Sequence, residues 1–427
     1  MTTERALGSR LPRAMTDPGV WVLSVLGIVL LATNSGFAQA PVDDALDYRR
    51  IAEAAPHLPV KPIASAFTAR FAIHYIVGQL HVATGLNLDV AYNLVFAVLL
   101  AVLLVAVHLL FRGLPIGEFS LVAALFVFNP YAFRPYLLQT ETLQDLVFVF
   151  GVAVCLLGLR SRSTAAVILG LAIAVLGRQT AILVAPVAAG WLLNESHWRT
   201  IPGGRRPWGQ AIAALAVTVL LFVAVRTWSA RFSIQFEPTV LHDTVLNLLG
   251  GMPDTAVELA AHFARTLIPL MVPLAAFATL CGVLGWRRVP FGAWAALAMC
   301  VAIAAQPAMT DPRFPGFAFN EQRLAALALL PLVYAVAVLL DRTDRCKDNR
   351  WVPPLLVALL AVGSLHHEFS SIGPQSLAQF LAVQFIVAIV VSGLLIADRR
   401  PAGGARTTVH QDRNPLPNLA QGIGNVP

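Results

Sequence analysis

Charge is the scarcest property of this chain. Only 12% of its 427 residues are Asp, Glu, Lys or Arg, whereas a soluble domain carries about 25%. Hydrophobic residues make up 57% and the mean hydropathy is +0.72. They fall in runs of about 15–23 residues, the length that crosses a hydrocarbon core of roughly 30 Å. The composition therefore predicts an all-α polytopic membrane protein.

Cysteine is also scarce, with four residues and no CxxC or Cys/His cluster. This excludes a disulfide framework, so we expect the cysteines in the apolar core. The chain has no P-loop, GxSxG, HExxH or strand–helix GxGxxG. Its net charge of +7 comes without the basic stripe and interleaved aromatics that nucleic acid needs, so we expect no nucleic-acid partner.

The apolar runs predict about twelve transmembrane helices, separated by short polar breaks. An even number of spans places both termini on the same side of the membrane. The predicted ranges are Val20–Phe37, Val90–Phe111, Phe119–Tyr131, Leu143–Leu159, Ala165–Leu176, Ala181–Leu193, Ala211–Trp228, Leu267–Trp286, Gly292–Gln306, Leu324–Leu340, Val352–Leu365 and Leu377–Ile396.

The two faces predicted for this bundle differ in charge. One face has short loops that, with both termini, hold about two thirds of the 30 Lys and Arg residues, so the positive-inside bias makes it cytoplasmic. We predict a cytoplasmic tail at 1–19, a transmembrane domain at 20–397 and a disordered cytoplasmic tail at 398–427. The first run also resembles a signal peptide with a cleavage site at Ala38-Gln39-Ala40; a retained signal anchor is preferred because many spans follow.

The opposite, extracytoplasmic face carries more than half of the 23 Asp and Glu residues. Its first loop, 38–89, contains the semi-apolar stretch Ile63–Gly85, in which Arg70, His74 and His81 form one polar stripe at helical spacing. We interpret this stretch as a helix lying in the membrane interface. If it crossed the bilayer, everything after it would flip, against the charge bias.

An acidic group directly follows the first predicted span. Asp43, Asp44 and Asp47 lie within five residues and are followed by Tyr48. Mutual repulsion at a low-dielectric boundary favours a bound cation, a hydroxyl-rich ligand or a raised pKa, and a raised pKa suits a general base. The alternative is a solvated loop that Arg49 and Arg50 partly neutralise.

A second polar group lies between the third and fourth predicted spans, from Arg134 through Gln139 and Glu141 to Asp145. Glu141 and Asp145 are four residues apart and share one helix face. Helix capping is the alternative explanation, because a helix N-terminus favours negative charge. Asp145 lies close to the hydrocarbon, where an ionisable side chain is a functional hypothesis by default.

Arginines mark two further candidate positions. Arg178 occupies a polar hinge between two short spans, where a guanidinium suits a phosphate or a loop carboxylate. Arg313 and Arg323 flank an aromatic loop, and Arg323 opens a span; an aromatic belt explains the loop's phenylalanines equally well. His366 begins a polar His-His-Glu cluster that is poorly arranged for a metal.

These motifs resemble the GT-C glycosyltransferases, polytopic enzymes that use polyprenyl-phosphate sugars outside the cytoplasmic membrane. Asp43-Asp44 and Asp47-Tyr48 match the place and type of the family's first-loop acidic motif. Glu141 and Asp145 match acids that recur between the third and fourth spans, and the segment Gly177–Pro186 is similar to a common pair of short helices. The chain lacks the large periplasmic domain of some members, so it resembles compact mannosyltransferases that act on lipid-linked acceptors.

The resemblance implies a donor that is a polyprenyl-phosphate sugar, an acceptor that is lipid- or glycan-linked, and inversion at the sugar. Asp44 or Asp43 would be the general base and Asp47 a support, because a phosphate leaving group needs little acid assistance. Arg178, Arg323 and Arg313 would bind the donor phosphate. Whether a divalent cation (Mg or Mn) is held is left open. The implied substrate-binding residues are Tyr48, Gln139, Glu141, Asp145, His74 and His366, and the implied metal ligands are Asp43, Asp44 and Glu141.

Two other classes compete with this interpretation. A twelve-helix secondary transporter also predicts cytoplasmic termini, although it usually shows repeat symmetry and polar residues at mid-membrane. A flippase, polymerase or ligase would handle lipid-linked sugars through outer-loop arginines and histidines.

Overall fold

The computed structural model describes residues 17–39, 44–194, 208–234, 266–308, 317–343, 345–346, 349–365, 370–371 and 376–398. About 80% of the described residues are helical. The tail at 398–427 lies outside them except for Asp398.

The first half of the chain runs from α3 through the helices of the segment 44–84 and into the bundle. Its elements are α3 (Pro18–Ala32), α4 (Asp44–Ala54), β1 (Ile63–Ala64), α5 (Ser65–Thr68), α6 (Phe71–Thr84), α7 (Leu88–Phe111), α8 (Ile116–Val127), α9 (Arg134–Leu138), α10 (Leu143–Ser161), α11 (Thr164–Gly177) and α12 (Ala181–Leu193).

The second half completes the bundle. Its elements are α14 (Trp208–Ser229), β2 (Ser233–Ile234), η1 (Ile268–Leu270), α17 (Met271–Leu284), η2 (Trp286–Arg288), α18 (Phe291–Ala308), α19 (Phe317–Ala326), α20 (Leu329–Thr343), α21 (Val352–Leu365) and α22 (Leu377–Ala397).

The all-α class is confirmed, and each range predicted as a span contains a helix. Within the described residues, five helices are long and apolar enough to cross a membrane, and seven shorter apolar helices accompany them. Most residues of α10 and of Gln322–Thr343 are buried, whereas a third or fewer of the residues in the apolar stretches of α14, α7 and α22 are buried. An apolar helix that stays exposed is suited to lipid contact, so α10 and α20 form the inner core.

Two predicted helices end earlier than their apolar runs suggest. The first stops at Ala32 rather than Phe37, because the Thr33 hydroxyl donates to the Val29 carbonyl and Asn34 pairs with Ser370. The third stops at Val127 rather than Tyr131. There Pro130 disfavours helical backbone at the preceding residue.

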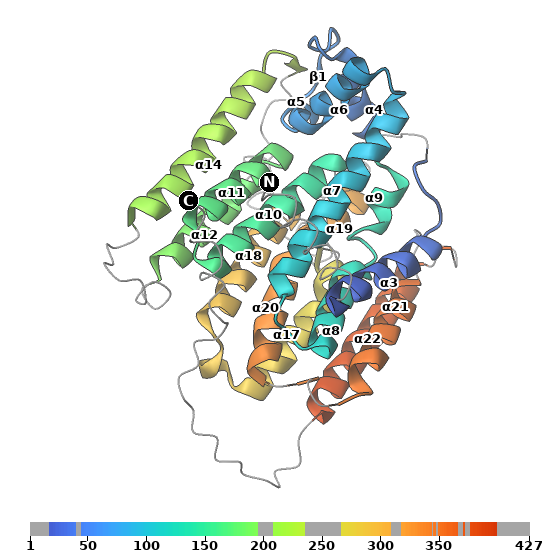
Figure 1. Ribbon diagram of the computed structural model, residues 1–427, viewed down its shortest axis with the longest axis vertical. Coiled ribbons are helices and arrows are strands. Elements are labelled where there is room, and N and C mark those ends of the chain that lie inside the picture. Colours follow the sequence, from blue (N-terminus) through green and yellow to red (C-terminus); the bar gives the residue numbers. More distant parts are fainter. Residues whose placement is uncertain are drawn as a thin grey trace, which may run out of the picture.

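The helices α4, α5 and α6, which follow the first predicted span, lie together at one end of the molecule, at the top of Figure 1. The predicted helix at Ile63–Gly85 is confirmed only in part, since α6 begins at Phe71 after a short strand and α5. β1 pairs in parallel with β2, joining Ile63 to Ser233, and this ties the first loop to the end of α14. Phe71 stacks on Trp228 beside this junction, with ring centroids 4.0 Å apart.

Glycines allow the backbones that carry the site to touch. A Cβ on Gly78 of α6 would lie 2.1 Å from the Ala52 carbonyl oxygen of α4. A Cβ on Gly177, at the end of α11, would lie 2.4 Å from the Phe148 nitrogen of α10. Small residues permit such close helix approach in membrane proteins.

Gly177→Ala is expected to force α11 away from α10 and to lower the free energy of unfolding by about 1–3 kcal/mol, the usual cost of overpacking. The measurement is thermal unfolding of the purified protein in detergent. Gly190→Ala in α12 is the matched control, because nothing lies within 4 Å of its Cβ. Equal effects of the two substitutions would contradict the close contact.

Candidate functional site

Three buried charges meet where α10, α11 and α19 converge. Asp145 is fully buried and Arg178 is 1% exposed; the Arg178 Nε donates to Asp145 Oδ1. The Arg323 Nε lies 3.5 Å from Asp145 Oδ2. Burying charge is costly unless it is paired, so this arrangement is specific. We call these three residues the Asp145 cluster.

Local structure explains how the sequence brings this pair together. Asp145 lies in the first turn of α10, where the helix dipole favours a carboxylate. Arg178 is the C-cap of α11 in an extended conformation (φ −150°, ψ 141°), so the chain turns there before α12. The close contact at Gly177 then sets the guanidinium beside Asp145.

The cluster leaves hydrogen-bond donors unused among the described residues. Nη1 and Nη2 of Arg178, Nε of Arg323 and Nε of the neighbouring Arg70 are buried without a hydrogen-bond partner. Buried donors of this kind are rare in proteins. Together they are suited to an anion with several acceptor oxygens.

The helix α4 places a carboxylate and a phenol beside the Asp145 cluster. Asp44 Oδ2 lies 3.7 Å from Arg323 Nη2, and the Asp44 side chain is 26% exposed. Tyr48, one turn later, accepts a hydrogen bond of 2.8 Å from Arg70 Nη1. With these neighbours the site contains three guanidinium groups and two carboxylates, so its charge favours an anionic ligand.

Asp47 faces away from this cluster. It accepts a hydrogen bond of 2.7 Å from Arg50 within α4, and the Arg50 side chain is largely exposed. The buried face of α4 consists of Ala45, Tyr48, Ile51 and Ala52. Asp44 and Asp47 therefore lie on different sides of α4, although their sequence positions suggest the same role.

The imidazole ring of His74 packs against the ring of Tyr48. The two rings are stacked with centroids 4.3 Å apart, and the histidine nitrogens lie 3.2 Å from the Tyr92 hydroxyl and 3.1 Å from Gln144 Oε1. Burial lowers the pKa of His74 to about 3, so the ring is neutral at ordinary pH. His74 points into the protein rather than along an interfacial stripe, and this geometry suits positioning rather than substrate contact.

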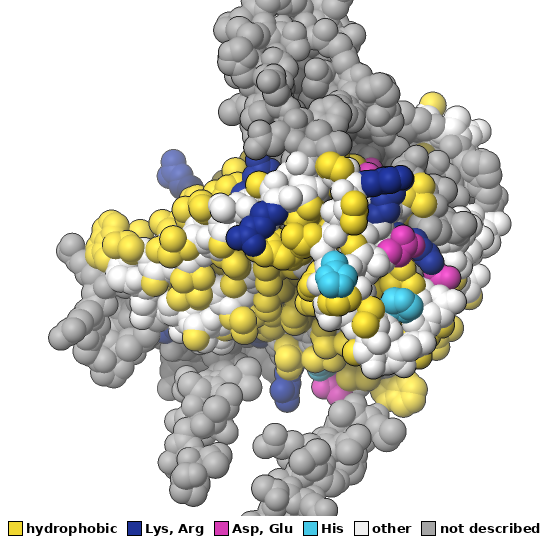
Figure 2. All heavy atoms as spheres, turned by 90° about the horizontal axis from the view of Figure 1, so that it is seen from above, with side chains coloured by type: hydrophobic (Ala, Val, Ile, Leu, Met, Phe, Trp, Pro, Cys, Tyr) yellow, Lys and Arg dark blue, Asp and Glu magenta, His cyan; other side chains and the backbone are white. Residues whose placement is uncertain are grey.

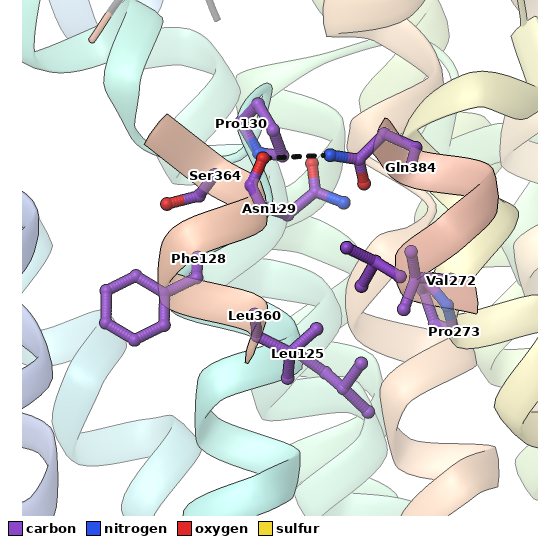
Figure 3. Close-up of a pocket in the computed structure, with 11 residues that line it drawn as sticks. Leu125, Phe128, Asn129, Pro130, Val272, Pro273, Leu360, Ser364 and Gln384 are labelled. Carbon is purple, nitrogen blue, oxygen red and sulfur yellow. Dashed lines mark hydrogen bonds between the residues drawn. The ribbon is translucent and has the colours of Figure 1, made fainter. Parts of the chain in front are cut away.

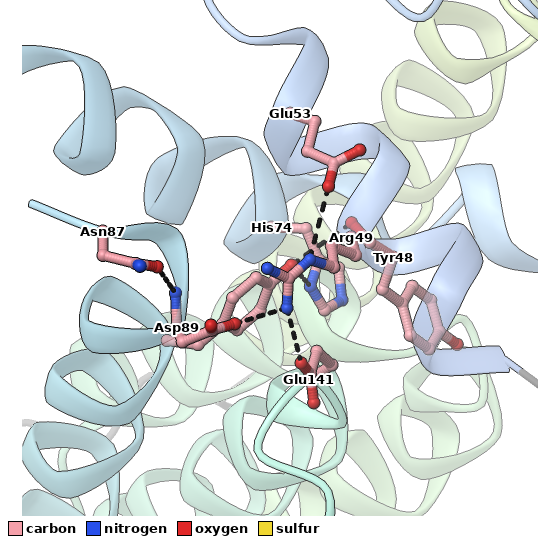
Figure 4. Close-up of polar contacts among 8 residues, drawn as sticks. Tyr48, Arg49, Glu53, His74, Asn87, Asp89 and Glu141 are labelled. Carbon is pink, nitrogen blue, oxygen red and sulfur yellow. Dashed lines mark hydrogen bonds and ion pairs between the residues drawn. The ribbon is translucent and has the colours of Figure 1, made fainter. Parts of the chain in front are cut away.

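A second charged group lies beside the first and is shown in Figure 4. The guanidinium of Arg49 on α4 contacts three carboxylates: Glu53 at 3.3 Å, Asp89 at the start of α7, and Glu141 at 3.6 Å in the loop before α10. We call these four residues the Arg49 cluster. It connects α4 to two separate parts of the bundle.

Glu141 is the buried member of the Arg49 cluster, and its side chain is 4% exposed. Its Oε2 has no hydrogen-bond partner in the described part of the chain. Burial raises the pKa of Glu141 above its usual value, while a backbone hydrogen bond and Arg49 oppose the rise. The ionised carboxylate is therefore less favoured in the folded protein than in the unfolded chain.

The raised pKa of Glu141 predicts a pH-dependent stability difference. Below the unfolded pKa both states are protonated and Glu141 costs nothing; as pH rises through the folded pKa, its contribution turns unfavourable. We expect Glu141→Gln to melt at a higher temperature than the wild type at pH 7. The gap should shrink as pH falls and vanish near pH 4. A gap that does not change with pH would contradict this assignment.

Arg134 and Gln139 lie at the two ends of α9. The fully buried guanidinium of Arg134 donates to the Thr33 carbonyl at 2.9 Å and to the Ser364 hydroxyl at 3.1 Å, so it joins α3 to α21. Gln139 ends α9, and its carbonyl accepts from the Thr142 hydroxyl at 2.7 Å. Three predicted site residues, Asp43, Arg313 and His366, lie outside the described residues.

Within the described residues, no three His, Cys, Asp or Glu side chains form a group that could hold a metal ion. All four cysteines are free and buried. Figure 2 looks onto the end that carries α4 and α6, and shows acidic and histidine side chains mainly right of the centre, with Lys and Arg side chains spread more widely. Hydrophobic side chains cover the arm on the left, towards α14.

No protein-family model, curated protein or solved structure matches this chain. The two charged clusters are therefore the features of the described structure that bear on function.

A small cavity lies elsewhere, between the end of α8 and the helices α17, α21 and α22 (Figure 3). Its volume of about 20 Å³ suits a single water molecule. Asn129, Ser364 and Gln384 supply its polar groups among apolar side chains. None of its lining residues belongs to either charged cluster, so it is not the candidate site.

Four residues in or beside these clusters were not recognised as site residues from the sequence: Arg49, Glu53, Arg70 and Asp89. Arg70 was placed only in a helical stripe, and Arg49 only as a neutraliser of nearby aspartates. Arg70 lies four residues before His74, and that spacing was a usable signal. The contacts of Arg49 with Asp89 and Glu141 span 40 and 92 positions of the chain, and no local pattern announces them.

Proposed function

We propose that this protein is a membrane glycosyltransferase that moves a sugar from a polyprenyl-phosphate donor to a lipid- or glycan-linked acceptor. The observation that carries the proposal is a partly exposed carboxylate, Asp44, beside buried arginines with unused donors. Such an arrangement holds a proton acceptor next to an anion site. That is the combination that a sugar phosphate and an attacking hydroxyl require.

The chemistry follows from these positions. Asp44 accepts the proton of the acceptor hydroxyl as its oxygen attacks the anomeric carbon. The bond from that carbon to the phosphate oxygen breaks, and the polyprenyl phosphate leaves with the electron pair. Arg178 and Arg323 stabilise the negative charge on the departing group. Attack from the face opposite the phosphate inverts the anomeric centre.

The proposal includes the GT-C-like architecture and its orientation. About twelve spans would place both termini in the cytoplasm and α4, α5 and α6 on the extracytoplasmic side of a bacterial cytoplasmic membrane. The donor's prenyl chain would lie among lipid-facing helices, with its phosphate at the Asp145 cluster. A divalent cation is not part of this proposal, because Glu141, one of the ligands implied for Mg or Mn, pairs with Arg49 while Asp44 lies beside Arg323.

The direct test uses purified protein in proteoliposomes with polyprenyl phosphates that carry radiolabelled mannose, glucose or arabinose. A lipid extract of the host membrane supplies acceptors. The proposal expects a new labelled glycolipid from one donor, and Arg178→Ala should lose most of that product. A transporter or flippase would instead move label across the bilayer without forming a new glycosidic bond, and that result would overturn the proposal.

A further inference from the structure

The Arg49 cluster combines many negative charges with a single positive one. Three carboxylates from three elements surround one guanidinium: Glu53 on α4, Asp89 on α7 and Glu141 in the loop before α10. Nη1 alone contacts both Asp89 and Glu141, so those two carboxylate oxygens face the same nitrogen (Figure 4). The formal charge of the four residues is negative even with Arg49 in place.

Carboxylate oxygens that converge on one point are the ligands that hard divalent cations prefer. Glu141 points into this group, its side chain is 96% buried, and its Oε2 has no hydrogen-bond partner among the described residues. With Arg49 in place the described carboxylates do not form a group that could hold a metal ion. The guanidinium occupies the point at which Asp89 and Glu141 meet.

We propose that Arg49 is a built-in substitute for a divalent cation in this carboxylate cluster. The positive charge of Arg49 neutralises Asp89 and Glu141. Because Arg49 belongs to α4, its contacts with these two carboxylates hold α4 against the bundle. Arg49 is thus a positioning residue for Asp44 and Tyr48. The inference does not depend on sugar transfer, because it concerns how the helix is fixed.

Two consequences follow. The wild-type cluster binds no divalent cation, because the guanidinium and a metal would compete for the same oxygens. Without Arg49 the three carboxylates repel one another, α4 loosens, and a divalent cation can take the vacant position and restore it. The packing of α4 would then depend on a divalent cation in a variant that lacks Arg49, but not in the wild type.

The test compares purified wild-type protein with Arg49→Gln, Arg49→Lys and the double variant Arg49→Gln/Glu141→Gln. Arg50→Gln is the matched control, since Arg50 is the next residue and its ion pair among the described residues is with Asp47 in α4. Mn²⁺ binding is measured by electron paramagnetic resonance of the free ion. Amide hydrogen exchange of residues 44–54 reports how firmly α4 is held.

Arg49→Gln should bind Mn²⁺ at least tenfold more tightly than the wild type, and the double variant should lose that gain. Exchange in α4 should rise about tenfold in Arg49→Gln, return towards wild type with saturating Mn²⁺, and stay unchanged in Arg50→Gln. If Arg49→Gln does not fold, Arg49→Lys serves instead: it keeps a positive charge, so it should gain no Mn²⁺ binding while α4 exchange still rises.

Two results would overturn the inference. One is wild-type protein that binds Mn²⁺ as tightly as Arg49→Gln through Glu141, which would make the cluster an ordinary metal site. The other is α4 exchange that does not change when Arg49 is replaced. Neither readout uses catalytic activity, so failure here is distinct from failure of the proposed sugar transfer.

Discussion

Asp44→Asn is expected to reduce sugar transfer by about 10²–10⁴-fold, the usual contribution of a general base. Asp44 is partly exposed and lies 3.7 Å from Arg323 Nη2, so in the proposed reaction it can contact the acceptor hydroxyl beside the bound phosphate. Asparagine keeps the size of the side chain and removes only its ability to accept a proton. The loss should therefore appear in kcat, with little change in KM for the donor.

Asp47→Asn is the matched control for that experiment. Asp47 lies three residues later on the same helix, but it pairs with Arg50 on the exposed side of α4. We expect less than about a threefold change in rate, because an exposed ion pair contributes roughly 0–1 kcal/mol. Initial rates with saturating polyprenyl-phosphate donor decide between the two residues. Equal losses, or a larger loss for Asp47, would remove Asp44 from the role of base.

Asp145→Asn is expected to be the most destabilising single substitution in the site, at about 3–5 kcal/mol. The change leaves the guanidinium of Arg178, 1% exposed, without its only hydrogen-bonded carboxylate in the described structure. Arg323 loses the same partner. An uncompensated buried charge, rather than a lost attraction, causes most of this cost.

A double-mutant cycle tests that explanation. Arg178→Met should also destabilise the protein, but Asp145→Asn/Arg178→Met should cost less than the sum of the two single changes by about 1–3 kcal/mol. Urea or thermal unfolding in one detergent provides the four values. Simple additivity would contradict a direct pairing, and Asp47→Asn/Arg50→Gln gives the reference for an exposed pair.

The helices were predictable because their signal is local. A run such as Val352–Leu365 is apolar throughout and ends in polar residues, and the structure gives the same bounds. The ends at Ala32 and Val127 were harder to place, since they depend on a threonine hydroxyl and on a proline within runs that remain apolar. That a helix exists follows from composition, whereas its last residue depends on specific contacts.

Most residues of the candidate site could be predicted from the sequence, but their arrangement in space could not. The acids after the first span and the arginines at 178 and 323 were candidates, and the structure brings Asp44, Asp145, Arg178 and Arg323 together. The difference between Asp44 and Asp47 was available in principle, because Tyr48 and Ala52 follow Asp44 at spacings of four and eight along one face. The division of the charged residues into two clusters could not be predicted, because it depends on contacts between segments that are far apart in the sequence.

The order in which the Asp145 cluster is synthesised has a consequence for biogenesis. Asp44 leaves the ribosome about 280 residues before Arg323, and at about 5–20 residues per second that interval is on the order of 15–60 s. During this time α4 has been synthesised, but Arg323, the arginine that lies beside Asp44, does not yet exist. A chain interrupted before α19 would therefore carry Asp44 without this partner.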